Sequence, residues 1–214
     1  MNAPRRGCFI TLEGGEGSGK STQVSRLAEA FVIAGLPHLV TREPGGTTGA
    51  ESIRKLLVEG DGDRWDPMTE TVLFMAARVD HVRKKIIPAL RKGTHVICDR
   101  FADSTMVYQG LAKGLGEEFI TLMHNFCLGD FQPDLTLIFD ITPEEGLKRA
   151  GARKGNENRF EGLDISFHQK IREGFLQIAL EHPSRCAVVD ASQASDQVQK
   201  QVAAAIRERL GLAL

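Results

Sequence analysis

The sequence lacks the features that are typical of membrane proteins, secreted proteins and proteins stabilised by disulfides or structural metals. Among its 214 residues, no apolar run approaches the ~20 residues that a membrane-spanning helix needs, and the run at residues 8–12 is shorter than the roughly 7–15 residues of a secretory signal. We therefore expect a cytoplasmic chain without a membrane partner, in which residues 8–12 form a buried strand. Hydrophobic residues make up 42% of the chain, enough for a sizeable core without disulfides or a structural metal.

Cysteine and histidine are few and scattered. The four cysteines, Cys8, Cys98, Cys127 and Cys186, form no CxxC pair, and the six histidines form no HxH or HxxxH pair. Pairs of this kind are typical of redox and zinc sites. We expect reduced, mostly buried thiols and no zinc site.

The chain also lacks an excess of charge of either sign. It has 27 Lys and Arg residues against 28 Asp and Glu residues, a formal net charge of −1, and an isoelectric point near 6.6. A general nucleic-acid surface would normally carry a basic excess. We expect no nucleic-acid partner.

Short apolar runs alternate along the chain with longer amphipathic stretches. We predict strands at residues 8–12, 38–41, 94–98, 135–139 and 187–189. Helices are predicted at residues 19–34, 52–59, 68–91 (bent or restarted near Pro88), 117–128, 143–150, 166–181 and 195–210. Strands that are apolar throughout and alternate with helices are typical of a parallel sheet buried on both faces. The prediction is a three-layer α/β fold with a five-stranded parallel sheet, a single domain of residues 1–214, and a polar, mobile lid at about residues 151–162.

A phosphate-binding motif follows the first predicted strand directly. The pattern GxxxxGK[ST] is formed by Gly14, Gly15, Glu16, Gly17, Ser18, Gly19, Lys20 and Ser21, and Thr22 follows it at the start of a predicted helix. In such a loop, backbone N–H groups and the helix N-terminus surround phosphate oxygens, Lys20 would reach the outer phosphates and Ser21 would ligate Mg²⁺. A glycine-rich turn explains the glycines but not Lys20 and Ser21 at this spacing. We predict a P-loop NTPase fold that binds ATP and Mg²⁺.

The residues after the third strand predict which kind of P-loop protein this is. The DxxG and NKxD sequences that GTP-binding switch proteins need are missing from the chain. Asp99 follows the strand where a Mg²⁺ carboxylate belongs, and the adjacent Arg100 indicates a second anionic group in the same cleft. Arginines facing a P-loop are the layout for passing a phosphoryl group between two anions.

With these motifs together, the sequence resembles the thymidylate kinases over essentially its whole length. Besides the P-loop, the resemblance rests on TREPGGT at 41–47, FMAAR at 74–78, DRF at 99–101 with Ser104, YQG at 108–110 and PDLT at 133–136. It implies transfer of a phosphoryl group from ATP to dTMP, giving ADP and dTDP for dTTP synthesis, and a homodimer. Residues 68–91 and 117–128 carry apolar faces that are suited to a dimer interface.

The resemblance also implies a pocket for the thymine base. Phe74 would stack on the ring, Arg78 would donate to a base carbonyl oxygen, and Pro44 would line the pocket. Thr105 and Gln109 stand where hydrogen bonds to the base edge are expected.

The remaining implied roles concern the sugar, the phosphates and the metal. Arg100 would clamp the acceptor phosphate, with Ser104 in the same site. Tyr108 would close the space beside the sugar and disfavour a 2′-hydroxyl, and Glu16 would lie near the 3′-hydroxyl and the metal. Glu16 therefore joins Ser21 and Asp99 as a candidate for binding Mg²⁺.

The P-loop has no arginine, so the resemblance is to the bacterial type in which the lid supplies it. Arg153 would be the main catalytic arginine, with Arg149 and Arg159 also contacting ATP. Adenine would bind near residues 190–193. At position 158 this chain departs from the family, which often has Asp where Asn158 stands.

Each residue also has a plainer interpretation. Phe74 can be core, Asp99 and Arg100 can form a structural ion pair, and residues 148–159 can be a solvated charged face. Two other functions compete with a nucleotide kinase. A deoxynucleoside kinase would need a carboxylate base such as Glu16, Glu43 or Asp99, whereas Arg78 and Arg100 suit a bound phosphate better; a nucleotide-sensing regulator would not need Lys20, Ser21 and Asp99 all intact.

Overall fold

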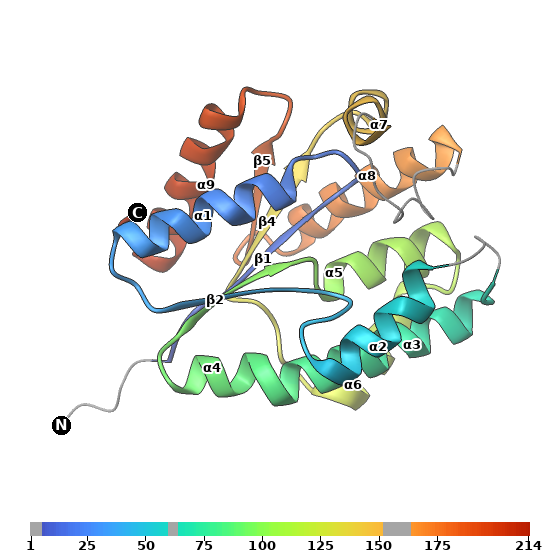
Figure 1. Ribbon diagram of the computed structural model, residues 1–214. Coiled ribbons are helices and arrows are strands. Elements are labelled where there is room, and N and C mark those ends of the chain that lie inside the picture. The colour runs from blue at the N-terminus through green and yellow to red at the C-terminus, as the bar shows by residue number, and fades with distance from the viewer. Residues whose placement is uncertain (1–5, 60–63, 152–163) are drawn as a thin grey trace.

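The computed structural model describes residues 6–59, 64–151 and 164–214 (Figure 1). The predicted lid at about residues 151–162 therefore lies, apart from its first residue, outside the described residues. Within them, none of the helices is both long and apolar enough to cross a membrane.

A parallel five-stranded sheet forms the centre of the described part of the chain. Its strands are β1 (Phe9–Gly14), β2 (His38–Arg42), β3 (His95–Asp99), β4 (Leu135–Asp140) and β5 (Cys186–Asp190), in the order β2-β3-β1-β4-β5. β1 is buried along its whole length, as expected for the middle strand of a sheet covered on both faces. This confirms the predicted fold class.

The register of the sheet brings the candidate site residues to one edge. β1 pairs with β3 so that Leu12 lies beside Asp99, and the P-loop begins at Gly14, the last residue of β1. Because parallel strands end at the same edge, the P-loop and the sequence after β3 are neighbours there. Ligands of open α/β sheets bind at this edge.

Helices cover both faces of the sheet, as Figure 1 shows. On one face, α1 (Lys20–Ile33) and α9 (Ser195–Leu210) pack their apolar sides over Ile10, Leu137 and Val189. The other helical elements are α2 (Thr48–Val58), α3 (Pro67–His81), α4 (Ile87–Arg91), α5 (Ala102–Thr105), α6 (Glu117–Leu128), α7 (Pro143–Gly151), α8 (Ile165–Glu181) and the π-helical segments η1 (Val82–Ile86) and η2 (Met106–Ala112).

The predicted long helix 68–91 restarts near Pro88, as expected. α3 passes through the π-helical segment η1 into α4, and Pro88 falls in the first turn of α4. Because proline has no N–H to donate to the preceding turn, the regular hydrogen-bond pattern of the helix is interrupted there. Asp66 caps the N-terminus of α3 by accepting hydrogen bonds from the N–H groups of Met68 and Thr69.

A helical segment at residues 102–112 was missing from the prediction. α5 and η2 lie there, although the segment contains Ser104, Thr105 and Gly110, which favour helices weakly. Val107 and Tyr108 pack against Ile171 and Phe175 of α8. Tertiary packing therefore stabilises a helix that local sequence does not indicate.

Candidate active site

The P-loop runs from the end of β1 to the start of α1 and touches α7. Gly17 has φ 66°, and a Cβ atom there would lie 1.9 Å from the carbonyl oxygen of Gly146. A Cβ atom at Gly146 would lie 2.5 Å from the carbonyl oxygen of Glu16. Both positions therefore need glycine, and the backbone of α7 forms one wall of the loop.

Lys20 is folded back onto the P-loop. Its Nζ donates hydrogen bonds to the carbonyl oxygens of Gly14 at 3.0 Å and Gly15 at 2.7 Å, and to Ser18 Oγ at 3.1 Å. Burial, together with the charge of Arg100, lowers the pKa of Lys20 to about 8. A phosphate group would offer this ammonium a better partner than neutral carbonyl oxygens.

Two of the three predicted metal ligands lie together. Ser21 Oγ donates to Asp99 Oδ2 at 3.0 Å, across the boundary between α1 and β3. A hydroxyl and a carboxylate are hard oxygen donors that suit Mg²⁺, which binds through few protein ligands when phosphates complete its shell. Among the residues that the structure describes, no group of three His, Cys, Asp or Glu side chains could hold a metal ion by itself.

Arg100 connects the end of β3 to the P-loop. Its Nη1 donates to the carbonyl oxygen of Gly14 and to Ser104 Oγ, both at 3.1 Å. It is also the one non-glycine residue with positive φ in the described part of the chain, at 68°. This conformation is strained for a side chain of its size and is common at functional sites.

Glu16, the third predicted metal ligand, faces Arg100 and Tyr108 instead of Ser21. Its Oε1 accepts from Arg100 Nη2 at 2.8 Å and from the Tyr108 hydroxyl at 2.9 Å. Burial by itself would raise the pKa of Glu16, but Arg100 and Lys20 together hold it below its usual value. The Arg100 guanidinium also lies 5.2 Å from the centre of the Tyr108 ring.

A buried carboxyl group, that of Glu13, binds the segment that follows Arg100. Glu13 Oε1 accepts from the Phe101 N–H at 2.7 Å, and Glu13 Oε2 accepts from Ser104 Oγ at 2.6 Å. Burial and the neighbouring Asp103 raise the pKa of Glu13 to about 7. Glu13 was not predicted as a site residue; its signal in the sequence is an acidic residue at the end of a buried strand.

The predicted base-pocket residues lie on α3 and on the α5–η2 segment. Phe74 is half-buried on α3, one turn before Arg78. Arg78 Nη2 donates to Thr105 Oγ1 at 2.8 Å, which joins the two segments. Gln109 is buried, and its amide donates to Glu70 Oε1 at 2.8 Å.

Arg78 also has partners that were not predicted. Its Nε donates to Glu43 Oε2 at 2.6 Å, and His81 Nδ1 lies 3.0 Å from Glu43 Oε1. Glu43 and Arg78 belong to two of the sequence motifs, but nothing in the motifs indicates that they pair. Pro44, the next residue, is half-buried, and its carbonyl oxygen accepts from Arg54 Nη1 at 2.8 Å.

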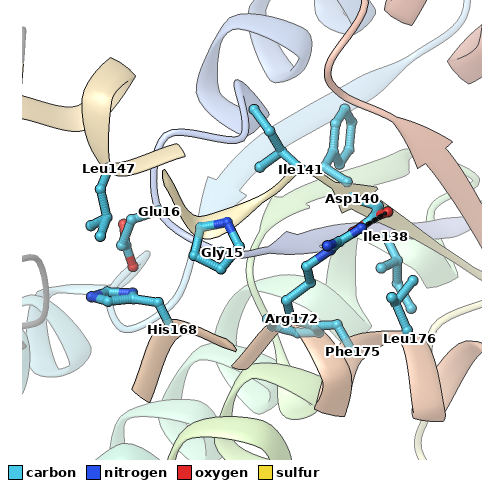
Figure 2. A pocket seen from close by; sticks show the side chains of 12 residues that line it. Gly15, Glu16, Ile138, Asp140, Ile141, Leu147, His168, Arg172, Phe175 and Leu176 are labelled. Atoms are coloured by element: carbon cyan, nitrogen blue, oxygen red, sulfur yellow. Dashed lines mark hydrogen bonds and ion pairs between the residues drawn. The ribbon is translucent and has the colours of Figure 1, made fainter. Parts of the chain in front are cut away.

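Behind the P-loop, a small cavity separates it from the start of α8 (Figure 2). Figure 2 shows the His168 ring and the Glu16 carboxyl group pointing toward one another. His168 is only 4% exposed, and its Nε2 has no hydrogen-bond partner among the described residues. On the other side, Arg172 Nε and Nη2 hold Asp140 at 2.6 Å and 3.0 Å.

Of the three predicted lid arginines, one lies in the described residues. Arg149 Nη1 donates to the carbonyl oxygen of Ala191 at 2.8 Å, and Nη2 donates to that of Ser192 at 3.2 Å. Arg149 therefore joins α7 to the segment where adenine was expected. Arg153 and Arg159, with Asn158, lie outside the described residues.

Comparison with known proteins identifies close relatives. A family model described as thymidylate kinase matches residues 12–202. Thymidylate kinase of Bradyrhizobium diazoefficiens is 50% identical over 207 residues, which cover 96% of this chain and 91% of that protein. Thymidylate kinase of Caulobacter vibrioides is 49% identical over 207 residues, covering 97% of this chain and 99% of that protein. The crystal structure of thymidylate kinase from Ehrlichia chaffeensis has a TM-score of 0.76 and 35% identity to this chain, covering 92% of this chain and 97% of that one.

Proposed function

The chain belongs to the thymidylate kinase family, and we propose that it transfers the terminal phosphoryl group of ATP to dTMP, giving ADP and dTDP. The observation that carries the proposal is the meeting of the P-loop with Arg100, whose guanidinium contacts both Gly14 and Glu16. One anion-binding loop and one cationic clamp at the same sheet edge suit two phosphate-bearing substrates.

On the donor side, the P-loop from Gly14 to Ser21, with Thr22 after it, would hold the ATP phosphates. Backbone N–H groups and the N-terminus of α1 would face the phosphate oxygens. Lys20 would exchange its carbonyl partners for phosphate oxygens as charge develops on them. Arg149 would support the adenine site through the carbonyl groups of Ala191 and Ser192.

Mg²⁺ fits the pair Ser21 and Asp99, with Glu16 as a more distant candidate. When bound, the ion neutralises phosphate charge. The pair itself orients the first turn of α1 toward the end of β3, since Ser21 Oγ and Asp99 Oδ2 are 3.0 Å apart.

On the acceptor side, Arg100 and Ser104 would hold the phosphate of dTMP. This phosphate is already ionised at neutral pH, so the reaction needs no general base, and catalysis depends on positioning and charge stabilisation. Tyr108, held by Glu16, would stand beside the sugar and exclude a 2′-hydroxyl.

The base would lie against α3 and η2. Phe74 would stack on the thymine ring, Arg78 would donate to a carbonyl oxygen, and Pro44 would line the pocket. Thr105 and Gln109 would border the base edge; in the structure they form hydrogen bonds with Arg78 and Glu70.

We assign the lid at about residues 151–162 to the same single domain, residues 1–214. Its Arg153 would complete the charge around the transferred group, with Arg159 on ATP, and closure would exclude water so that ATP is not hydrolysed. Replacing Arg153 with Ala should lower turnover at least tenfold in a steady-state assay; near-normal turnover would move this role to Arg149 or Arg159.

We propose a cytoplasmic homodimer formed through α3 and α6. These helices leave large apolar side chains exposed: Met68 and Val72 on α3 at 43% and 47%, and Leu122 and Phe126 on α6 at 65% and 89%. Exposed apolar patches of this kind are typical of protein interfaces. Sedimentation velocity would measure the association state.

A coupled assay of ADP release tests the function. The acceptors are dTMP, dUMP, the ribose form of TMP, and thymidine, each with Mg·ATP. Fast turnover of dTMP with little turnover of the ribose form is expected. Turnover of thymidine but not dTMP would favour a deoxynucleoside kinase and require a carboxylate base; ATP binding without any turnover would favour a nucleotide-sensing regulator.

A further inference from the structure

Three buried side chains, those of Glu43, His81 and Thr41, form one hydrogen-bonded chain behind the Arg78 guanidinium. Glu43 accepts from Arg78 Nε at 2.6 Å through Oε2 and lies 3.0 Å from His81 Nδ1 through Oε1. His81 Nε2 in turn lies 2.7 Å from Thr41 Oγ1. The exposed fractions are 2% for Arg78, 5% for Glu43, 0% for His81 and 7% for Thr41, so little water competes for these contacts.

The proton positions follow from the carboxylate. An ionised Glu43 can only accept hydrogen bonds, so His81 Nδ1 carries the proton that faces it. His81 Nε2 is then the acceptor for the Thr41 hydroxyl. The Thr41 hydroxyl can donate to Nε2, which satisfies the tautomer of His81 that donates to Glu43.

Most of the donors of Arg78 are already engaged. Nε is held by Glu43, and Nη2 donates to the Phe101 carbonyl oxygen at 3.1 Å and to Thr105 Oγ1 at 2.8 Å. Within the described part of the chain, Nη1 has no hydrogen-bond partner. Because a guanidinium is planar, fixing Nε and Nη2 also fixes the direction in which Nη1 donates.

Gly46, in the loop after β2, leaves room for the contact between His81 and Thr41. Gly46 has φ 90°, and a Cβ atom there would lie 2.4 Å from His81 Nε2 and 2.6 Å from Thr41 Oγ1. A side chain at position 46 would therefore collide with the His81–Thr41 contact. Thr41 lies near the end of β2, and Glu43 and Gly46 lie in the loop after it, whereas Arg78 and His81 lie on α3.

We propose that His81 is a positioning residue for acceptor binding: it orients Glu43, and Glu43 orients Arg78 so that Nη1 donates to a carbonyl oxygen of the pyrimidine base. The inference rests on the proposed function, because it requires Arg78 to contact the acceptor. His81 acts in binding and leaves phosphoryl transfer itself unchanged.

Two substitutions of His81 distinguish a role in orienting Glu43 from a role in packing alone. In His81→Asn, the side-chain amide nitrogen stands near the place of Nδ1 and retains the donor to Glu43. In His81→Gln, the amide reaches the place of Nε2 and loses that donor, although glutamine is closer to histidine in size. We expect His81→Gln to raise the KM for dTMP about tenfold and His81→Asn to raise it no more than about threefold. Turnover at saturating dTMP and the KM for ATP should change by no more than about twofold in both.

A third variant and a direct binding measurement cover the case in which these substitutions disturb folding. Thr41→Val keeps the bulk of the side chain but removes the hydroxyl that bonds His81 Nε2, and it should weaken dTMP affinity about threefold in calorimetry without ATP. The exposed His182→Gln is the matched control and should leave both constants unchanged.

The outcomes are distinct. Equal KM values for the Asn and Gln variants, a loss confined to turnover, or unchanged dTMP affinity in Thr41→Val would overturn the role of His81. A wild-type protein that neither binds nor phosphorylates dTMP would overturn the proposed function instead.

Discussion

The phosphate side and the base side of the site each contain an arginine paired with a glutamate, but the two pairs differ in burial. Arg100 and Glu16 have side chains that are 20% and 22% exposed, whereas the side chains of Arg78 and Glu43 are 2% and 4% exposed. The first pair lies at the open edge of the sheet, and the second is enclosed between α3 and the loop after β2.

The difference indicates which contacts a ligand can replace. Lys20 and Arg100 rest on backbone carbonyl oxygens of the P-loop, which are weaker partners for a cation than a phosphate is. Arg78 rests on a buried carboxylate, which is a stronger partner for a cation than a neutral carbonyl oxygen. We infer that the phosphate side rearranges when substrates bind, whereas the base side is arranged beforehand.

The sharpest test of this difference is to remove each glutamate in turn. Glu43→Ala should lower the free energy of unfolding by about 3–5 kcal/mol, because it leaves the Arg78 charge buried without its carboxylate. Glu16→Ala should lower it by no more than about 1 kcal/mol, because Arg100 remains partly exposed to water. Urea unfolding measures both, and equal losses would contradict the contrast.

The second test removes a phosphate-side charge and asks about activity. Lys20→Met should lower turnover about 10²–10³-fold, corresponding to ~2.7–4 kcal/mol for the loss of one electrostatic donor. The melting temperature should stay the same or rise, because the fold holds the pKa of Lys20 down at about 8 and so disfavours its charge. The exposed Lys200→Met is the control for both readouts. A Lys20→Met protein that melts well below the wild type would mean that Lys20 stabilises the fold after all.

The third test concerns Glu13, which lies beneath the phosphate side. Its carboxyl group titrates near 4.5 in the unfolded chain and at about 7 in the folded one, so the folded state keeps a proton between these values. Protonated Glu13 therefore stabilises the folded state fully below pH 4.5. This contribution, about 3 kcal/mol at most, is lost as the pH rises from 4.5 through 7.

Glu13→Gln should abolish this dependence, because an amide does not titrate in this range. Its oxygen can still accept from the Phe101 N–H, whereas the Ser104 hydroxyl, which donates to Glu13 Oε2, would instead accept from the amide nitrogen. The measurement is the difference between wild-type and variant unfolding free energies from pH 4 to pH 8. A difference that does not vary with pH would show that Glu13 titrates normally.

The sheet, the P-loop and most helices could be predicted from the sequence, because each depends on a local pattern of residues. Alternating apolar runs predict the strands, and the spacing of Lys20 and Ser21 after the glycines predicts the loop. The helical segment at residues 102–112 could not be predicted this way, since its stability comes from packing against α8.

The buried pairs could not be predicted from the sequence, for a related reason. Glu43 and Arg78 are 35 residues apart, and the motifs that contain them do not indicate that they meet. Glu13 and Ser104 are 91 residues apart and meet because β1 and β3 are neighbours. Such contacts depend on the order of strands in the sheet, which is a property of the whole fold.

The close approach of Gly17 and Gly146 has a consequence for how this protein can change through mutation. A single added methyl group on α7 would meet the backbone of the P-loop before it met any nucleotide. Selection for ATP affinity therefore acts on a helix whose side chains at that point need never touch ATP. Any side chain at position 146 would therefore displace the P-loop, so nucleotide affinity depends on a glycine that need not contact the nucleotide itself.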